Sequence, residues 1–215
     1  MNFIVNQAKM QDILGVSQVH LHCFSGHFLS NFGNRFLNVY YSNYLTYPKH
    51  LLLIAKFENK IVGFVAGTLS TDLLYRSLFR ENFFTIARLT LFRFMANGEF
   101  RKQLFKRLHF VKGAIKSKIL SNKNREKTAP EQKLNNCRLL SIAVLRDFWN
   151  KGASLKLIMA FEQEVKKRGA QECFLSVKKD NLRAVGFYQK AGWRISKEAG
   201  GSYIFTKNLS SIKNE

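Results

Sequence analysis

The sequence has few residues of several kinds, and each scarcity excludes a class of protein. Its 215 residues include only two prolines, so long proline-rich linkers are not expected. Its three cysteines lie far apart, without a CxxC spacing or suitably placed histidines, so they are predicted to be reduced packing residues and no metal site is expected. No run approaches the ~20 apolar residues that span a bilayer. No basic segment followed by an apolar one opens the sequence, so we expect a cytoplasmic location.

Acidic residues are also scarce, at 14 Asp and Glu against 35 Lys and Arg, which gives a formal net charge of +21. Such a charge attracts anionic partners, among them phosphorylated small molecules, nucleic acid and acidic lipid. Nucleic acid is disfavoured, because no RNA-binding signature of paired aromatic residues on adjacent strands is present. A hydrophobic content of 46% predicts a globular protein, read here as a single domain over residues 1–215.

The N-terminal part of the sequence alternates between strand and helix patterns. Residues 3–5 predict a short strand, and the apolar spacing from Met10 to Leu21 predicts a helix. Aromatic residues at every third or fourth position predict a second helix from Leu29 to Tyr47. Residues 51–55 and 61–67 predict two antiparallel strands joined by a tight turn.

The character of the sequence changes between about residues 72 and 136, where many apolar residues are interleaved with Arg and Lys. This pattern predicts a basic insertion with helices of its own, which we expect to cover the acceptor side of the protein. Its tail, Lys116 to Lys133, loses the apolar residues, and this composition predicts a linker.

Ordered elements are predicted again from Cys137 onward. Residues 139–144 indicate a buried strand, and the apolar spacing that follows indicates a helix beginning near Gly152 and ending at Gly169. The remaining predictions are a strand at 173–177, a short helix at 181–190, and a final pair of strands at 193–195 and 203–206.

The segment from Trp149 to Ser154 lies between the buried strand and its helix, where chemistry is most readily placed. A helix start offers free backbone N–H groups and the positive end of the helix dipole to an anion. Gly152 allows the backbone to come close to phosphate oxygens, Lys151 adds a positive charge, and Ser154 adds a hydroxyl donor. A single glycine at a helix start is, by itself, more often a turn than a phosphate site.

The residues from 181 to 193 add a second motif. They resemble the motif Asn-x-x-Ala-x-x-Phe-Tyr-x-x-x-Gly-Phe of the GCN5-related N-acetyltransferase (GNAT) family. The matching residues are Asn181, Ala184, Phe187, Tyr188 and Gly192, with Trp193 in the final aromatic position. The order of strands and helices also fits that family over nearly the whole chain, apart from the insertion.

The resemblance implies an α/β fold with a central mixed sheet flanked by helices and splayed open between the strand ending at Val144 and the strand around Phe174. Acetyl-CoA, the acyl donor, would lie in this gap with its pyrophosphate on the N–H groups of residues 150–154 and its pantetheine arm along the strand at 142–144. The implied cofactor contacts are Ile142, Val144, Asn150, Lys151, Gly152, Ala153, Ser154, Asn181 and Tyr188. The sequence departs from the family at Trp149, where Gln or Arg is usual, and at Ser154, where Gly or Ala is usual.

The resemblance also implies the catalytic role. Tyr188 would lie near the thioester sulfur, and tyrosine, whose reference pKa is about 10, carries a proton at neutral pH that it can donate to the leaving thiolate. Tyr188 is therefore the predicted general acid. The strand from Cys137 to Val144 carries no carboxylate to act as a base, which leaves a water relay or one of His20, His22 and His27, although histidines near a helix end are usually surface or packing residues.

The predicted function is that of an acetyl-CoA-dependent N-acetyltransferase acting on a primary amine. The basic insertion and the net charge favour a small anionic acceptor such as a nucleotide-linked amino sugar, and the layout loosely resembles transferases of surface-polysaccharide assembly. One alternative is a protein or peptide N-acetyltransferase, although the positive charge would repel basic acceptors. Another is a non-catalytic module that binds anionic polymers or a membrane surface. Whichever function holds, the basic helices of the insertion could rest on anionic lipid.

Overall fold

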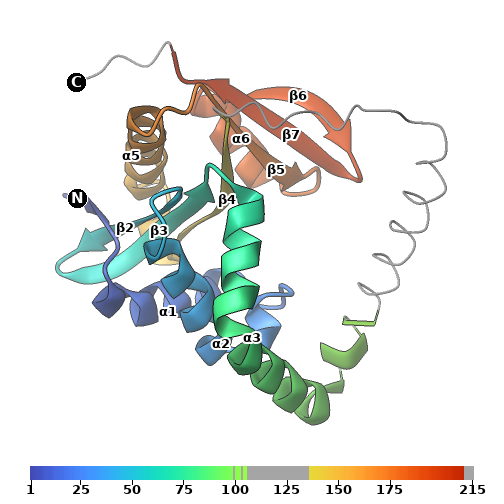
Figure 1. Ribbon diagram of the computed structural model, residues 1–215. Helices are drawn as coiled ribbons and strands as arrows, with labels where there is room; N and C mark the ends of the chain where they lie inside the picture. The colour runs from blue at the N-terminus through green and yellow to red at the C-terminus, as the bar shows by residue number, and fades with distance from the viewer. Residues whose placement is uncertain (99, 103, 106–135, 211–215) are drawn as a thin grey trace, which may run out of the picture.

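The computed structural model describes residues 1–98, 100–102, 104–105 and 136–210. Its centre is a seven-stranded mixed sheet in the order β1-β2-β3-β4-β5-β7-β6, in which only β4 and β5 run parallel (Figure 1). The strands are β1 (Ile4–Gln7), β2 (His50–Phe57), β3 (Lys60–Thr68), β4 (Asn136–Val144), β5 (Glu172–Lys178), β6 (Arg194–Ala199) and β7 (Ser202–Asn208).

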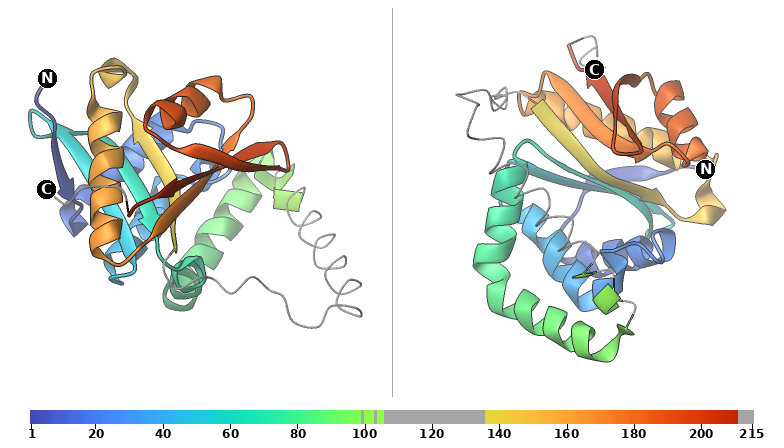
Figure 2. Two further views of the ribbon diagram at one scale, coloured as in Figure 1. Left: turned by 90° about the horizontal axis from the view of Figure 1, so that it is seen from above. Right: turned by 90° about the vertical axis from the view of Figure 1, so that its right-hand side faces the viewer.

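Helices cover both faces of the sheet (Figure 2). The helices are α1 (Ile13–Cys23), α2 (Asn34–Ser42), α3 (Thr71–Ala96), α5 (Ala153–Lys167) and α6 (Leu182–Lys190). One hydrophobic cluster joins α1, α2 and α3 to one face, and a second joins α5 and α6 to the other. The α/β class and the mixed sheet flanked by helices, both predicted from the sequence, are confirmed.

The predicted hairpin between β2 and β3 is present, and its turn has a clear local cause. Phe57 pairs with Lys60, which leaves Glu58 and Asn59 as a two-residue loop with φ of +49° and +63°. Two central residues with positive φ match the right-handed twist of the strands they connect. Glu58 is therefore part of this turn, as the sequence indicated.

The prediction of one continuous helix from Leu29 to Tyr47 is wrong, because the segment is interrupted at Gly33. Gly33 adopts φ of +83°, a conformation that no helix contains, and it separates a short turn at Ser30–Phe32 from α2. The aromatic rings still stack along the segment, with Phe32 and Phe36 centroids 4.4 Å apart. The aromatic spacing thus marked the packing of these rings, whereas the glycine determined where the helix begins.

The long helix α3 occupies the first part of the predicted insertion. Its N-terminus is capped by Ser70, whose side chain accepts a hydrogen bond from the Leu73 N–H, and its axis is kinked at Asn82. The predicted linker at 116–133 lies outside the described residues. Among the helices of the described part, none is long and apolar enough to cross a membrane.

Candidate active site

The sheet opens between β4 and β5. These parallel strands pair at only three positions, from Asn136 opposite Glu172 to Arg138 opposite Phe174, and then separate. The register between β3 and β4 shifts at the same level, because Gly67 faces Leu139 whereas Ala66 faces Ser141, so Leu140 is an extra residue in β4. A bulge of this kind redirects the strand. The predicted opening between Val144 and Phe174 is confirmed.

Beyond the bulge, one edge of β4 pairs with β3 and the other edge faces the opening. The Leu145 N–H donates to the Val62 carbonyl of β3 at 2.9 Å. Backbone groups of successive strand residues point to opposite edges, so those of Val144 and Ile142 point into the opening. The Val144 carbonyl confirms this direction, because it accepts a hydrogen bond from the Trp149 indole N–H at 2.7 Å. The predicted cofactor edge at Ile142 and Val144 is thus exposed to the opening, with the Val144 carbonyl already paired.

The loop after β4 presents unpaired donors. Asn150 and Gly152 both have positive φ, of +59° and +93°, and Gly152 directly precedes α5. Within the described residues, no hydrogen bond from the backbone N–H groups of residues 150–154 is present, and the first helical bond runs from the Lys156 N–H to the Gly152 carbonyl. Unpaired N–H groups at the positive end of a helix dipole form a site for an anion.

Close packing holds α5, and therefore this loop, against the sheet. Leu157, Ile158 and Phe161 are fully buried. Gly67 on β3 permits the contact, since a Cβ atom there would lie 2.4 Å from the Phe161 ring. The candidate anion site thus sits on a closely packed helix, which fixes the position of its donors before any ligand arrives.

Helix α6 faces the opening from the β5 side. Asn181 caps it, with its side-chain oxygen accepting a hydrogen bond from the Ala184 N–H at 3.2 Å. Its Nδ2 group makes no hydrogen bond within the described residues. The predicted cofactor contact at Asn181 is therefore a helix cap first, with one amide group left for a ligand.

Tyr188 lies on the buried side of α6. Its ring packs against Trp193 and Phe205, with centroids 5.8 and 5.7 Å away. Burial raises the pKa of the Tyr188 hydroxyl well above its usual range, so the group is protonated at neutral pH. The hydroxyl has no hydrogen-bond partner within the described residues. This arrangement suits a donor, although the raised pKa makes complete proton transfer to a thiolate uphill.

A buried carboxylate lies behind the packed rings of Tyr188, Trp193 and Phe205. The Glu162 carboxylate on α5 accepts hydrogen bonds from the Trp193 indole at 2.8 Å and from the Lys207 ammonium at 2.7 Å. Burial raises the pKa of Glu162, while Lys207 opposes the shift. Glu162 therefore ties α5 to β7 behind Tyr188, which marks it as a structural residue.

Two further residues, which the sequence alone did not indicate, lie at the mouth of the opening. The Arg183 guanidinium carbon of α6 lies 3.2 Å from the centroid of the Trp149 ring, so this pair connects the two sides. The Cys23 thiol at the end of α1 lies 3.5 Å from the Val144 carbonyl. Burial raises the pKa of this thiol, and the nearby Arg183 charge opposes the shift only in part. Arg183 occupies a variable position of the motif, so only the fold shows that it reaches Trp149.

His20 is a packing residue in this structure. Its Nδ1 atom lies 2.6 Å from the Tyr41 hydroxyl, and the side chain is buried beside Phe24 and Phe64. Burial, together with the charge of His27, lowers the pKa of His20 to about 4. Within the described residues, no group of three His, Cys, Asp or Glu side chains could hold a metal ion.

Residues 113–193 match the sequence profile of the acetyltransferase (GNAT) family, and the described part of that match contains β4, α5, β5 and α6. This segment of the chain is similar to the GNAT family. The match confirms the predicted enzyme class, an N-acetyltransferase that takes its acetyl group from acetyl-CoA. The open strand edge and the unpaired N–H groups fit such a ligand.

Several solved structures show the same fold. A PaiA N-acetyltransferase from Thermoplasma acidophilum, solved in complex with coenzyme A, has a TM-score of 0.61 at 14% identity, covering 97% of this chain and 99% of that one. The ribosomal-protein-S18-alanine N-acetyltransferase from Escherichia coli has a TM-score of 0.56 at 12% identity, with coverage of 99% and 97%. Ard1 from Thermoplasma volcanium also reaches 0.56, at 13% identity, with coverage of 97% and 98%. No curated relative matches the sequence.

Proposed function

We propose that this enzyme transfers the acetyl group of acetyl-CoA to the primary amine of a small anionic acceptor, such as a nucleotide-linked amino sugar. One observation carries the acetyl-CoA part of the proposal: the opening between β4 and β5 has unpaired backbone donors on one side and Arg183 at its mouth. Neither β4 nor α6 carries a carboxylate that would offset this positive character. The pyrophosphate of acetyl-CoA would therefore meet backbone donors from the β4 side and the positive charge of Arg183 from the α6 side. The anionic acceptor is inferred from the net charge of +21.

The cofactor-binding residues follow from this geometry. The N–H groups of residues 150–154 would hold the pyrophosphate, with Lys151 and the Ser154 hydroxyl as additional donors. The Ile142 backbone and the Val144 N–H would pair with the pantetheine arm, and the free amide group of Asn181 would contact it from the β5 side. Most of these donors belong to the backbone, which explains how the loop tolerates Trp149 and Ser154 at its ends.

Bound acetyl-CoA supplies a thioester carbonyl for attack by the acceptor amine and releases a thiolate. A β4 N–H at Ile142 or Val144 would donate a hydrogen bond toward the carbonyl oxygen, where negative charge grows. The Tyr188 O–H would donate toward the sulfur as its charge develops. Because burial raises the pKa of Tyr188, its main contribution would be this hydrogen bond, and solvent can complete the protonation.

The acceptor distinguishes this proposal from acetylation of a protein or peptide amine. A net charge of +21 disfavours basic acceptors and favours phosphorylated ones. The three cysteines are all unpaired, which fits a reducing compartment, and a cytoplasmic location is part of the proposal.

An acceptor screen tests the proposal. The enzyme and acetyl-CoA would be incubated with amino sugars, their nucleotide derivatives, polyamines and peptides, and free CoA thiol would be measured. We expect turnover with nucleotide-linked amino sugars that exceeds turnover with the same sugars lacking phosphate. Preferential turnover of peptides would show that the acceptor is a peptide and not a small anion. Absence of acetyl-CoA binding would contradict the assigned cofactor site.

A further inference from the structure

The second half of α3 carries an apolar stripe that faces solvent. Its members recur at the spacing of one helix face, and those with large side chains are highly exposed: Phe84 at 86%, Leu91 at 63%, Phe92 at 69% and Met95 at 71%. We call these four residues, together with the exposed Ala87 and Arg88 between them, the outer stripe. Amphipathic helices of soluble proteins normally turn such a face toward the core.

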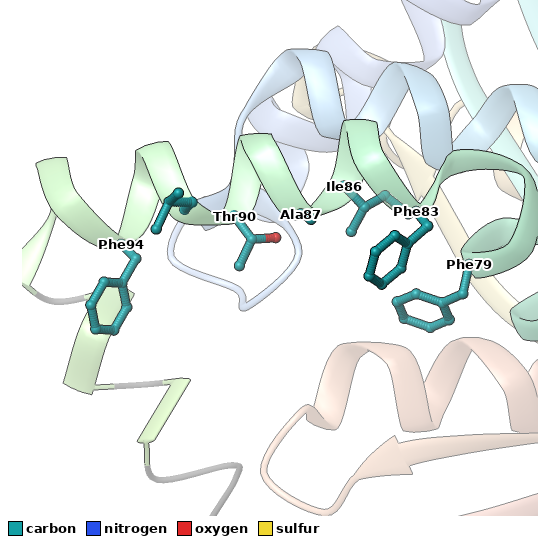
Figure 3. A pocket seen from close by; sticks show the side chains of 7 residues that line it. Phe79, Phe83, Ile86, Ala87, Thr90 and Phe94 are labelled. Carbon is teal, nitrogen blue, oxygen red and sulfur yellow. The ribbon is translucent and has the colours of Figure 1, made fainter.

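A second apolar surface adjoins the outer stripe. Phe79, Phe83 and Phe94 project from α3 beside Ile86 and Thr90, as Figure 3 shows. Together with Ala87 and Leu91 they line a cavity of about 310 Å³. The exposed apolar surface of α3 is thus continuous around much of the helix, which is far more than the scattered single residues of an ordinary surface.

The helix is firmly attached on its remaining side, so the exposure is not the result of a loosely attached helix. Leu74, Leu78 and Ile86 are buried in the cluster shared with α1 and α2. The Asn43 amide donates to the Leu74 carbonyl at 3.0 Å, and the Arg93 guanidinium donates to the Phe32 carbonyl at 3.3 Å. Ile86 and Arg93 lie beyond the kink at Asn82, so these two contacts fix which face of the second half of α3 points outward.

Charge indicates what covers the outer stripe. Arg76, Arg80 and Arg88 are exposed along the same helix, although Arg80 also pairs with Glu81, and the whole chain carries +21. Two copies meeting through this face would bring two such charges together, whereas an anionic lipid surface would attract each copy. Phenylalanine, leucine and methionine beside arginine match helices that lie in the headgroup region of a bilayer.

We propose that α3 is a docking surface for anionic membranes. The outer stripe enters the boundary between headgroups and acyl chains, and the arginines contact lipid phosphates. The helix lies on the membrane and does not span it, in agreement with the absence of a spanning helix in the described residues. The proposal stands apart from the acceptor assigned above, because it concerns a different surface.

Vesicle sedimentation with the full chain tests this surface. Wild type and the double variant Phe84→Ser/Phe92→Ser would be mixed with phosphatidylcholine vesicles with or without phosphatidylglycerol. The variant keeps the charge of the protein, so any general electrostatic attraction is unchanged. We expect wild type to sediment with the vesicles that contain phosphatidylglycerol, and the variant to bind them about tenfold less or weaker still, because two large apolar side chains no longer enter the bilayer.

Two controls sharpen the result. Met10 and Met159 are also exposed, at 68% and 51%, but lie outside α3, so Met10→Ser/Met159→Ser should bind like wild type. Arg88→Glu should weaken binding to the anionic vesicles. Equal vesicle binding by wild type and Phe84→Ser/Phe92→Ser would overturn the proposal. So would sedimentation velocity showing a wild-type dimer that this variant dissociates, with no binding to vesicles, since a second copy would then be the partner.

Discussion

The two sides of the opening between β4 and β5 offer different groups to a ligand. The β4 side presents backbone groups, from Ile142 and Val144 through the N–H groups of residues 150–154. The α6 side presents side chains, those of Asn181, Arg183 and Tyr188. Backbone groups remain when a side chain changes, whereas side-chain groups do not. Substitutions should therefore have large effects on the α6 side and small effects on the β4 side, unless they alter the backbone itself.

The largest effect is expected for Tyr188→Phe. The ring still fills the space against Trp193 and Phe205, and only the hydroxyl proposed to donate to the leaving sulfur is lost. We expect kcat to fall about a hundredfold, at the lower end of general acid effects because the raised pKa limits proton transfer. Steady-state kinetics, with calorimetry to show that acetyl-CoA affinity is retained, would measure this.

Tyr44→Phe is the matched control for Tyr188→Phe, because it removes a buried hydroxyl, one that pairs with Tyr40, in the other hydrophobic cluster. It should leave kcat unchanged. Full activity of Tyr188→Phe would show that Tyr188 is a packing residue and would contradict its predicted role as general acid.

The next largest effect is expected where the β4 side can be altered through its backbone. A side chain at Gly152 projects from a residue with φ of +93°, so Gly152→Val both strains the loop and obstructs the approach of a phosphate. Losing one charge-assisted hydrogen bond should weaken acetyl-CoA binding about tenfold or more. The thermal shift produced by acetyl-CoA should decrease accordingly.

Gly169 provides the control for Gly152. It lies beyond the other end of α5 with φ of +88°, and a Cβ atom there also meets nothing within 4 Å. Gly169→Val should therefore lower the melting temperature through the same kind of strain but keep the acetyl-CoA shift. If both variants lose the shift equally, strain in α5 accounts for the loss, and the phosphate site at residues 150–154 is not supported.

A smaller effect is expected for Arg183→Ala. Its guanidinium stacks on Trp149 next to residues 150–154, and burial lowers its pKa without removing the positive charge. We expect acetyl-CoA to bind about five- to tenfold more weakly, as for the loss of one charged contact. Binding of S-acetylpantetheine, which lacks the pyrophosphate, should be unaffected. An equal loss for both ligands would show that Arg183 holds the shape of the opening and does not contact phosphate.

The smallest effect is expected for Lys151→Ala and Ser154→Ala, which change side chains but leave the loop N–H groups in place. Each should weaken acetyl-CoA binding by about two- to threefold, as expected for an exposed charge or a hydroxyl contact that water can replace. Calorimetry would measure both affinities. A loss larger than that of Arg183→Ala would show that the β4 side also depends on its side chains.

The C-terminal elements could be predicted from the sequence because their patterns are local. The spacing of Leu157, Phe161 and Val165 predicted the buried face of α5. The opening of the sheet was implied by the resemblance of residues 181–193 to the GNAT motif. The break before α2 was not foreseen, because Gly33 acts through its positive φ and leaves the aromatic spacing unchanged.

The contacts across the opening could not be predicted. The Trp149 bond to Val144 and the stacking of Arg183 on Trp149 join residues from separate elements, and they depend on how the fold places those elements. The outward direction of the outer stripe was hidden for a related reason. Apolar spacing predicts that a helix has an apolar face but not whether that face packs against the core. Here Leu74, Leu78 and Ile86 pack in the core instead of the outer stripe.

Amide-resolved NMR of the protein titrated with acetyl-CoA tests the central claim most directly, because that claim concerns backbone N–H groups. The amides of residues 150–154, together with those of Ile142 and Val144, should shift on binding and exchange more slowly with solvent. The Gly169 amide, at the far end of α5, should not change. Binding of acetyl-CoA that leaves the amides of residues 150–154 and of Ile142 and Val144 unchanged while others shift would contradict the assigned site.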